Sequence, residues 1–392
     1  MGGTNPYTMA SRATLREAPP QTLYWAGLRG SMPRNDPEHP PAGDSRRVGP
    51  DVLRAAAILL VVVIHTSSSV VNAGPARGPG AWWAGNLFDS FARSGVPLFV
   101  LLSGWMLLTP ERRHEPIASF LWRRGQRILL PLVTWSALAY AWLALRDHRP
   151  AGWARFGRDL LNGPVYFHLW YVYILLGLYL AIPLLRPLAA ESSRPLRWYA
   201  LGLWFVGTAL LPLWEWWGGP HVGIPVMVLS TYVGYLLAGT WLAGIPVTPR
   251  TRWQLLFLFA LTGAWTMAAT SRLTGGEEMN VALYAYDRPN VLVMSVALFV
   301  LLTQAQPAGW ASRHPRILAI IRAVAATSFG AYLFHPLLID LLGSGILGFR
   351  LTAATIHPFV GIPLLSIAVL AVSVALMLVL RRIPFLGRAL GA

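Results

Sequence analysis

Residues 51–66 read DVLRAAAILLVVVIHT, an apolar run with one arginine near its start and one histidine near its end. A helix over 52–71 has the roughly 20 residues needed to cross about 30 Å of hydrocarbon. Arg54 and His65 are eleven positions apart, so at about 100° per residue they share one helix face. Asp51 is placed to pair with Arg54 one turn away. His65 lies about 16 Å beyond Arg54, where a buried ionisable group usually marks function.

Similar apolar segments fill the rest of the chain. Of the 392 residues, 55% are hydrophobic and 12% are charged, whereas a soluble domain carries about 25% charged residues. We predict an all-α, polytopic integral membrane bundle of about ten transmembrane helices over residues 51–392. The expected spans are 52–71, 94–109, 128–146, 168–186, 198–217, 224–244, 253–271, 289–305, 324–343 and 359–380.

The net charge of +16 comes from arginine alone, because the chain has no lysine. Most arginines fall between the expected spans, on segments that lie inside if both termini are cytoplasmic. They are therefore interpreted as topology signals and contacts to anionic lipid headgroups, and no nucleic-acid partner is expected. The loop with Arg149, Arg155 and Arg158 is the main exception, and an interfacial or re-entrant segment is predicted there.

The first 50 residues are rich in arginine and proline and have no signal-peptide core, so we expect a disordered cytoplasmic tail at 1–50. Met32 is an alternative start of translation. The absence of cysteine excludes disulfides, thiolate metal sites and a cysteine nucleophile. The all-arginine usage fits a GC-rich bacterial genome, and the predicted location is the bacterial inner membrane.

A basic cluster precedes the third expected span. Arg123, Arg124 and Arg127 are three or four residues apart, so their guanidinium groups can converge on one side of a helix. Guanidinium grips phosphate through two parallel hydrogen bonds, so the cluster suits a polyanion. A positive-inside anchor without a ligand explains the same residues equally well.

Five further residues are candidates for a polar site. His335 precedes a proline that frees a backbone carbonyl deep in the ninth span, and Asp340 follows it. His168 and Trp170 begin the fourth span, where an aromatic belt at the membrane interface is the alternative. Glu215 stands among tryptophans at the end of the fifth span, where a solvated carboxylate is equally expected.

Together these segments resemble the acyltransferase family 3 membrane proteins, across about residues 50–385. The resemblance rests on blocks that follow one another in the family's order. The His168 block continues in a way that is similar to the branch containing the O-acetyltransferase of enterobacterial common antigen. The blocks are Asp51-x-x-Arg54 with His65, Gly95-Val-Pro-Leu-Phe-Val-Leu-Leu-Ser103-Gly104, Arg123-Arg124-x-x-Arg127-Ile with Pro131, His168-Leu-Trp170-Tyr-x-Tyr, and Ser328-Phe-Gly-Ala-Tyr-Leu-Phe-His335-Pro336.

The resemblance implies transfer of an acyl group, typically acetyl, from acetyl-CoA to a hydroxyl of a sugar or glycolipid acceptor. Arg54, Arg124 and Arg127, with help from Arg123, are then expected to bind the phosphates of the donor. His65 is the expected general base, or forms an acetyl-histidine intermediate. His335 and Glu215 are further catalytic candidates, His168, Trp170 and Asp340 are substrate-binding candidates, and no metal is expected.

Two other classes of function remain open. A transporter or flippase for a lipid-linked sugar would use buried histidines for proton coupling. Against it, the sequence shows no internal repeat and no obvious pair of broken helices. A non-catalytic membrane sensor or scaffold would use the polar residues for stability alone.

Overall fold

The computed structural model describes residues 48–75, 78–147, 152–220, 230–275, 279–304 and 310–392. The predicted tail 1–50 and Met32 lie almost wholly outside these residues. The elements are α1 (Val48–Val71), α2 (Pro79–Ala92), α3 (Gly95–Leu107), η3 (Pro110–Arg112), α4 (Ile117–Asp147), α5 (Trp153–Asn162), η4 (Phe167–Leu169), α6 (Trp170–Glu191), α7 (Arg194–Phe205), η5 (Val206–Leu210), α8 (Leu211–Trp216), α9 (Thr231–Leu242), α10 (Pro249–Leu273), η6 (Ala282–Tyr284), α11 (Pro289–Thr303), α12 (Trp310–Arg313), α13 (Pro315–Ser344), α14 (Pro358–Leu380) and α15 (Pro384–Leu390).

The predicted all-α membrane bundle is confirmed. Within the described residues the regular structure is helical, and nine helical segments are long and apolar enough to cross a membrane. The protein is therefore a multi-pass membrane protein. The expected span 224–244 lies partly outside the described residues, and its described part is the twelve-residue helix α9.

Several spans begin earlier than predicted, the second and third by more than ten residues. The second spans Pro79–Leu107 and consists of α2 and α3, joined by a short turn. The third begins at Ile117, where 128 was predicted. Charged side chains in 79–93 and 117–127 lower the local hydropathy. In the structure Asp89 and Arg93 pair with each other, and Arg124 and Arg127 line a cavity.

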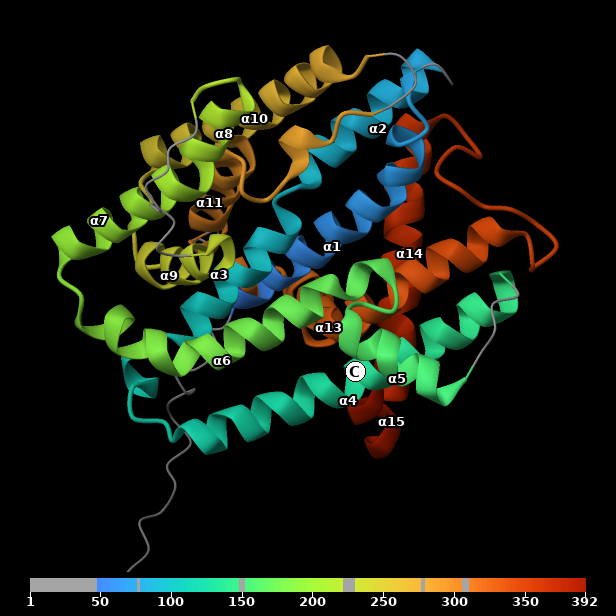
Figure 1. Ribbon diagram of the computed structural model, residues 1–392, viewed down its shortest axis with the longest axis horizontal. Helices are drawn as coiled ribbons and strands as arrows, with labels where there is room; N and C mark the ends of the chain where they lie inside the picture. Colours follow the sequence, from blue (N-terminus) through green and yellow to red (C-terminus); the bar gives the residue numbers. More distant parts are fainter. Residues whose placement is uncertain (1–47, 76–77, 148–151, 221–229, 276–278, 305–309) are drawn as a thin grey trace, which may run out of the picture. The chain divides into compact units, whose positions relative to one another are not determined.

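Helix α1 packs against α2, α3, α11, α13 and α14, so the first span lies inside the bundle (Figure 1). Its apolar side chains explain this position, because Leu53, Ile58 and Val62 are fully buried. Helix α13 packs along α1, and this contact brings distant parts of the sequence together. A residue on the inner face of α1 therefore faces the interior of the protein rather than lipid.

Two glycines allow α3 and α9 to approach closely. A Cβ atom at Gly104 would collide with the backbone of Leu236, and one at Gly239 would collide with the backbone of Leu101. Small residues at such positions let transmembrane helices pack with their backbones in contact. The close packing of α3 and α9 thus supports the part of α3 that carries Ser103.

The segment after α4, which was expected to be interfacial or re-entrant, contains the short helix α5. Its side chains Trp153 and Leu161 are strongly exposed. The hydroxyl of Tyr173 on α6 donates to the carbonyls of Leu160 and Gly163, at 2.6 and 2.9 Å. This fastening holds the end of α5 against α6.

Candidate active site

Three histidines from distant parts of the chain meet inside the bundle. His65 on α1 and His335 on α13 have ring centroids 5.1 Å apart, and His168 in η4 lies 6.0 Å from His335. His168 and His335 are almost completely buried, whereas His65 is half-buried. Sequence reasoning singled out all three, but expected His168 at the outer end of its span, away from the other two.

The backbone fixes the tautomers of two of these rings. Nδ1 of His335 lies 3.0 Å from the carbonyl of Ala331, and Nε2 of His168 lies 3.2 Å from the carbonyl of Leu333. A carbonyl can only accept, so each of these nitrogens carries the proton. The other nitrogen of each ring is buried and has no hydrogen-bond partner within the described residues. Each ring therefore offers one basic nitrogen inside the protein.

A cavity of about 540 Å³ begins at a set of four arginines. Three of them, Arg54, Arg124 and Arg127, are the residues predicted to bind phosphate. The fourth, Arg112 in η3, was not predicted, because its contact with the cavity depends on the turn between α3 and α4. Arg54 also pairs with Asp51 at 3.1 Å, as its spacing predicted.

This cavity also approaches the histidines, through two tyrosines. Its lining includes Tyr171 and Tyr332, whose rings are 5.5 Å apart. The Tyr332 ring lies 5.6 Å from that of His168 and 5.9 Å from that of His335. One face of α13 follows the cavity from Ala325 through Ser328 to Tyr332, with His335 next at helical spacing. The cavity therefore extends from four arginines to Tyr332, which lies beside the histidine centre.

Arg123 does not line this cavity. It forms an ion pair with Glu115, which also pairs with Arg186 at 2.5 Å and with Arg112 at 3.5 Å. Burial alone would raise the pKa of Glu115, but the hydrogen bond from Arg123 and the charges of Arg186 and Arg112 outweigh it and lower that pKa. Arg123 thus belongs to a network that joins η3, α4 and α6. Its role in donor binding stays a prediction.

Asp340 lies in a polar network at the other end of α4. Its carboxylate accepts hydrogen bonds from the Tyr166 hydroxyl and the Trp142 indole, each at 2.8 Å, and pairs with Arg146. Burial raises the pKa of Tyr166, and the bond to Asp340 raises it further, so the phenol stays protonated and donates. This network holds the chain that leads into His168 against α13.

The last two candidates lie outside the histidine centre. Trp170 stacks on Tyr286 with ring centroids 5.7 Å apart. Glu215 lies on α8, which packs mainly against the preceding segment η5. Their assigned roles therefore remain predictions.

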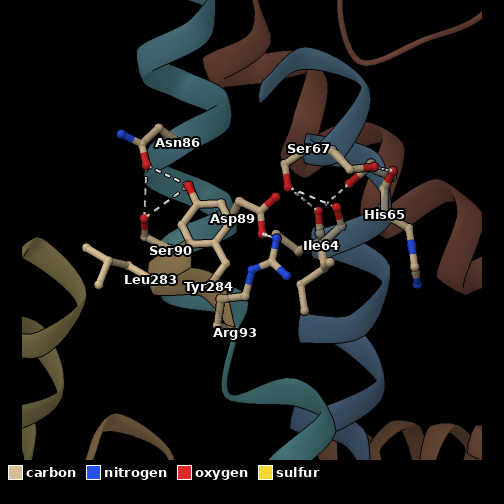
Figure 2. A network of polar contacts seen from close by, with 12 residues as sticks. Ile64, His65, Ser67, Asn86, Asp89, Ser90, Arg93, Leu283 and Tyr284 are labelled. Carbon is tan, nitrogen blue, oxygen red and sulfur yellow. Dashed lines mark hydrogen bonds and ion pairs between the residues drawn. The ribbon is translucent and has the colours of Figure 1, made fainter. Parts of the chain in front are cut away.

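An ion pair on α2 was missed by sequence reasoning. Arg93 and the fully buried Asp89 approach to 2.5 Å, and the Arg93 guanidinium lies 4.2 Å above the ring of Tyr284. Figure 2 shows this pair beside Ser67 and His65 of α1. The Tyr284 hydroxyl donates to Asn86 at 2.6 Å. The acid and base four residues apart were the available signal, but the segment was placed outside the spans.

The sequence model of an acyltransferase domain, acyltransferase 3, matches residues 47–378 and so covers most of the chain. The protein belongs to the acyltransferase 3 family. Comparisons with curated proteins and with solved structures find no match. The predicted family is confirmed, and this acyltransferase contains the arginine-lined cavity and the histidine centre within the matched residues.

The centre does not have the form of a metal site. Among the described residues, no group of three or more histidine, cysteine, aspartate or glutamate side chains is arranged to hold a metal ion. The imidazoles of this acyltransferase can transfer protons, and its guanidinium groups can bind anions.

Proposed function

We propose that this acyltransferase moves an acyl group, most simply acetyl, from acyl-CoA to a hydroxyl of a sugar in a surface polysaccharide, lipid-linked glycan or related glycoconjugate. The observation that carries the proposal is the cavity that runs from Arg54, Arg112, Arg124 and Arg127 to the rings beside His168 and His335. Phosphates suit its arginine end. The pantetheine arm would lie against apolar side chains of the lining such as Phe99, Leu102 and Leu175.

In the proposed reaction, the acceptor hydroxyl attacks the thioester carbonyl while His65 takes the hydroxyl proton. A carbon–oxygen bond forms, the carbon–sulfur bond breaks, and coenzyme A leaves as the thiolate, which then takes up the proton. His335 lies close enough to His65 to share or orient that proton, and His168 lies beside His335. Each of these two rings keeps one nitrogen without a partner within the described residues. An acetyl-histidine intermediate reaches the same product in two steps.

The direct test is acetyl-CoA-dependent labelling of membranes. Membranes containing the wild-type chain are expected to transfer radioactive acetyl groups to a glycan as base-labile esters. His65→Ala, inserted at the same level, is expected to transfer at least about a hundredfold more slowly, as loss of a general base usually costs. Labelling by His65→Ala at the wild-type rate would refute the mechanism. Transport of a lipid-linked sugar without any acetyl transfer would favour the flippase alternative.

A further inference from the structure

A second cavity, of about 420 Å³, lies between the end of α4, helix α5 and the segment that leads into η4. This size lies within the roughly 300–1,000 Å³ of small-molecule sites. Polar side chains on α5, namely Arg155, Asp159 and Asn162, face Tyr140 and Val165 across it. The sequence predictions assigned no ligand to any of these residues.

This second cavity lies at the opposite end of α4 from the arginine-lined cavity. Arg127 lines the first and Tyr140 lines the second, and the rise of an α-helix places them about 20 Å apart along α4. The two cavities also differ in charge. The first has four arginines, whereas the second has one arginine and a carboxylate, which would repel a polyphosphate. The second cavity is therefore unsuited to the acyl donor.

The second cavity is held in shape by its surroundings. Tyr173 fastens the end of α5 through the carbonyls of Leu160 and Gly163. The ring of Phe156 packs on that of Tyr140 with centroids 5.4 Å apart. The Tyr140 hydroxyl is buried and has no hydrogen-bond partner within the described residues. A buried hydroxyl of this kind is costly unless a ligand or water satisfies it.

The wall of the second cavity continues into the histidine centre. Val165 lines the cavity, Tyr166 is fixed by its bond to Asp340, and Phe167 follows. The Phe167 ring is 56% exposed and lies 5.3 Å from the ring of His65. The segment 165–167 thus runs from the second cavity to His65, and Phe167 is exposed on it.

We propose that the second cavity is the acceptor subsite and binds one sugar residue of the glycan that receives the acyl group. The amide of Asn162, the carboxylate of Asp159 and the guanidinium of Arg155 provide the mixed donors and acceptors that sugar hydroxyls require. The ring of Tyr140 and the side chain of Leu143 supply an apolar contact for a sugar face. This assignment rests on the proposed function and names the part of the chain that selects its acceptor.

Because the chain has no cysteine, a single introduced cysteine can be labelled selectively to block the second cavity. Asn162→Cys in the full chain, in membranes that carry the natural glycan, is treated with a bulky biotin maleimide and compared with the untreated variant. Acetyl transfer is expected to fall at least tenfold, and acetyl-CoA binding is expected to stay unchanged. The matched control is Leu161→Cys, because Leu161 neighbours Asn162, is 87% exposed and does not line the cavity. Its labelling is expected to leave transfer intact.

Unchanged transfer after complete labelling at position 162 would overturn the assignment, as would an equal loss at both positions. If Asn162→Cys fails to insert, Asp159→Asn gives the second measurement, with at least a tenfold higher KM for the glycan and an unchanged KM for acetyl-CoA. Equal KM values for the glycan in Asp159→Asn and wild type would also overturn it. Absence of transfer by the untreated wild type would instead count against the proposed function itself.

Discussion

At the scale of the residue, some arginines line the arginine-lined cavity and others, such as Arg123, do not. Arg127→Ala removes a cavity guanidinium, so we expect the Kd for acetyl-CoA to rise at least about tenfold, since a charge-assisted hydrogen bond contributes about 1.5–3 kcal/mol. Arg123→Ala is the control, because Arg123 pairs with Glu115 and does not itself line the cavity. Calorimetry on the purified variants measures both. Equal effects of the two substitutions would mean that the cavity does not bind the donor.

The lowered pKa of Glu115 predicts how the stability of the protein depends on pH. Its pKa is lower in the folded protein than its ordinary value of 4.5, so its ionised form favours folding. The stabilisation is present above about pH 4.5 and is lost as the pH falls through the lowered pKa of the folded state. Thermal unfolding between pH 7 and pH 3 should show a falling Tm below that point.

Glu115→Gln is the matching variant. It should be less stable at neutral pH by about 3–5 kcal/mol, because it leaves the buried guanidinium of Arg186 unpaired. Its stability should also vary less with pH between 3 and 4.5 than that of the wild type. An identical pH dependence in the variant and the wild type would show that other carboxylates control acid unfolding.

Some residues of the site were predictable because their partners are close in sequence. The spacing of Arg54 and His65 placed both on one face of α1, and the Asp51–Arg54 pair followed from one helical turn. The meeting of His168 with His335 could not be derived in this way. It depends on how η4 and α13 pack, which helical periodicity does not encode.

At the scale of the element, the close approach of α3 and α9 can be tested by enlarging one glycine. Gly239→Ala should force α9 away from the backbone of Leu101 on α3 and should reduce the amount of folded protein in the membrane. Gly177→Ala on α6 is the control, because no atom lies within 4 Å of a Cβ built there. That variant should be neutral, or more stable by up to about 1 kcal/mol. Size-exclusion profiles and thermal unfolding in detergent measure both, and equal behaviour would contradict the packing.

The existence and type of the helices followed from apolar length, but several boundaries did not. Hydropathy predicted 94 as the start of the second span because Asp89 and Arg93 interrupt the apolar pattern. In the structure these two side chains form an ion pair, and the membrane-spanning segment extends back to Pro79. A hydropathy average counts each charge as a cost and ignores its pairing with a partner one helical turn away.

At the scale of the whole molecule, the orientation in the membrane is a prediction that cysteine labelling can check. The donor cavity should open to the cytoplasm and α5 should face outward, as the arginine bias indicates. On intact cells, a membrane-impermeant maleimide should label Leu161→Cys, next to the second cavity. It should label Pro246→Cys, in the loop between α9 and α10, only after the cells are permeabilised. The opposite pattern would invert the topology and with it the side of donor entry.

The central claim is that one cavity joins a donor-binding end to a separate histidine centre. The most direct measurement is made on purified His65→Ala in lipid nanodiscs, with acetyl-CoA affinity and acetyl transfer determined in the same preparation. The account predicts an unchanged Kd for acetyl-CoA and transfer at least about a hundredfold slower than wild type. Wild-type transfer by His65→Ala, or a loss of transfer that is fully explained by a loss of acetyl-CoA binding, would contradict it.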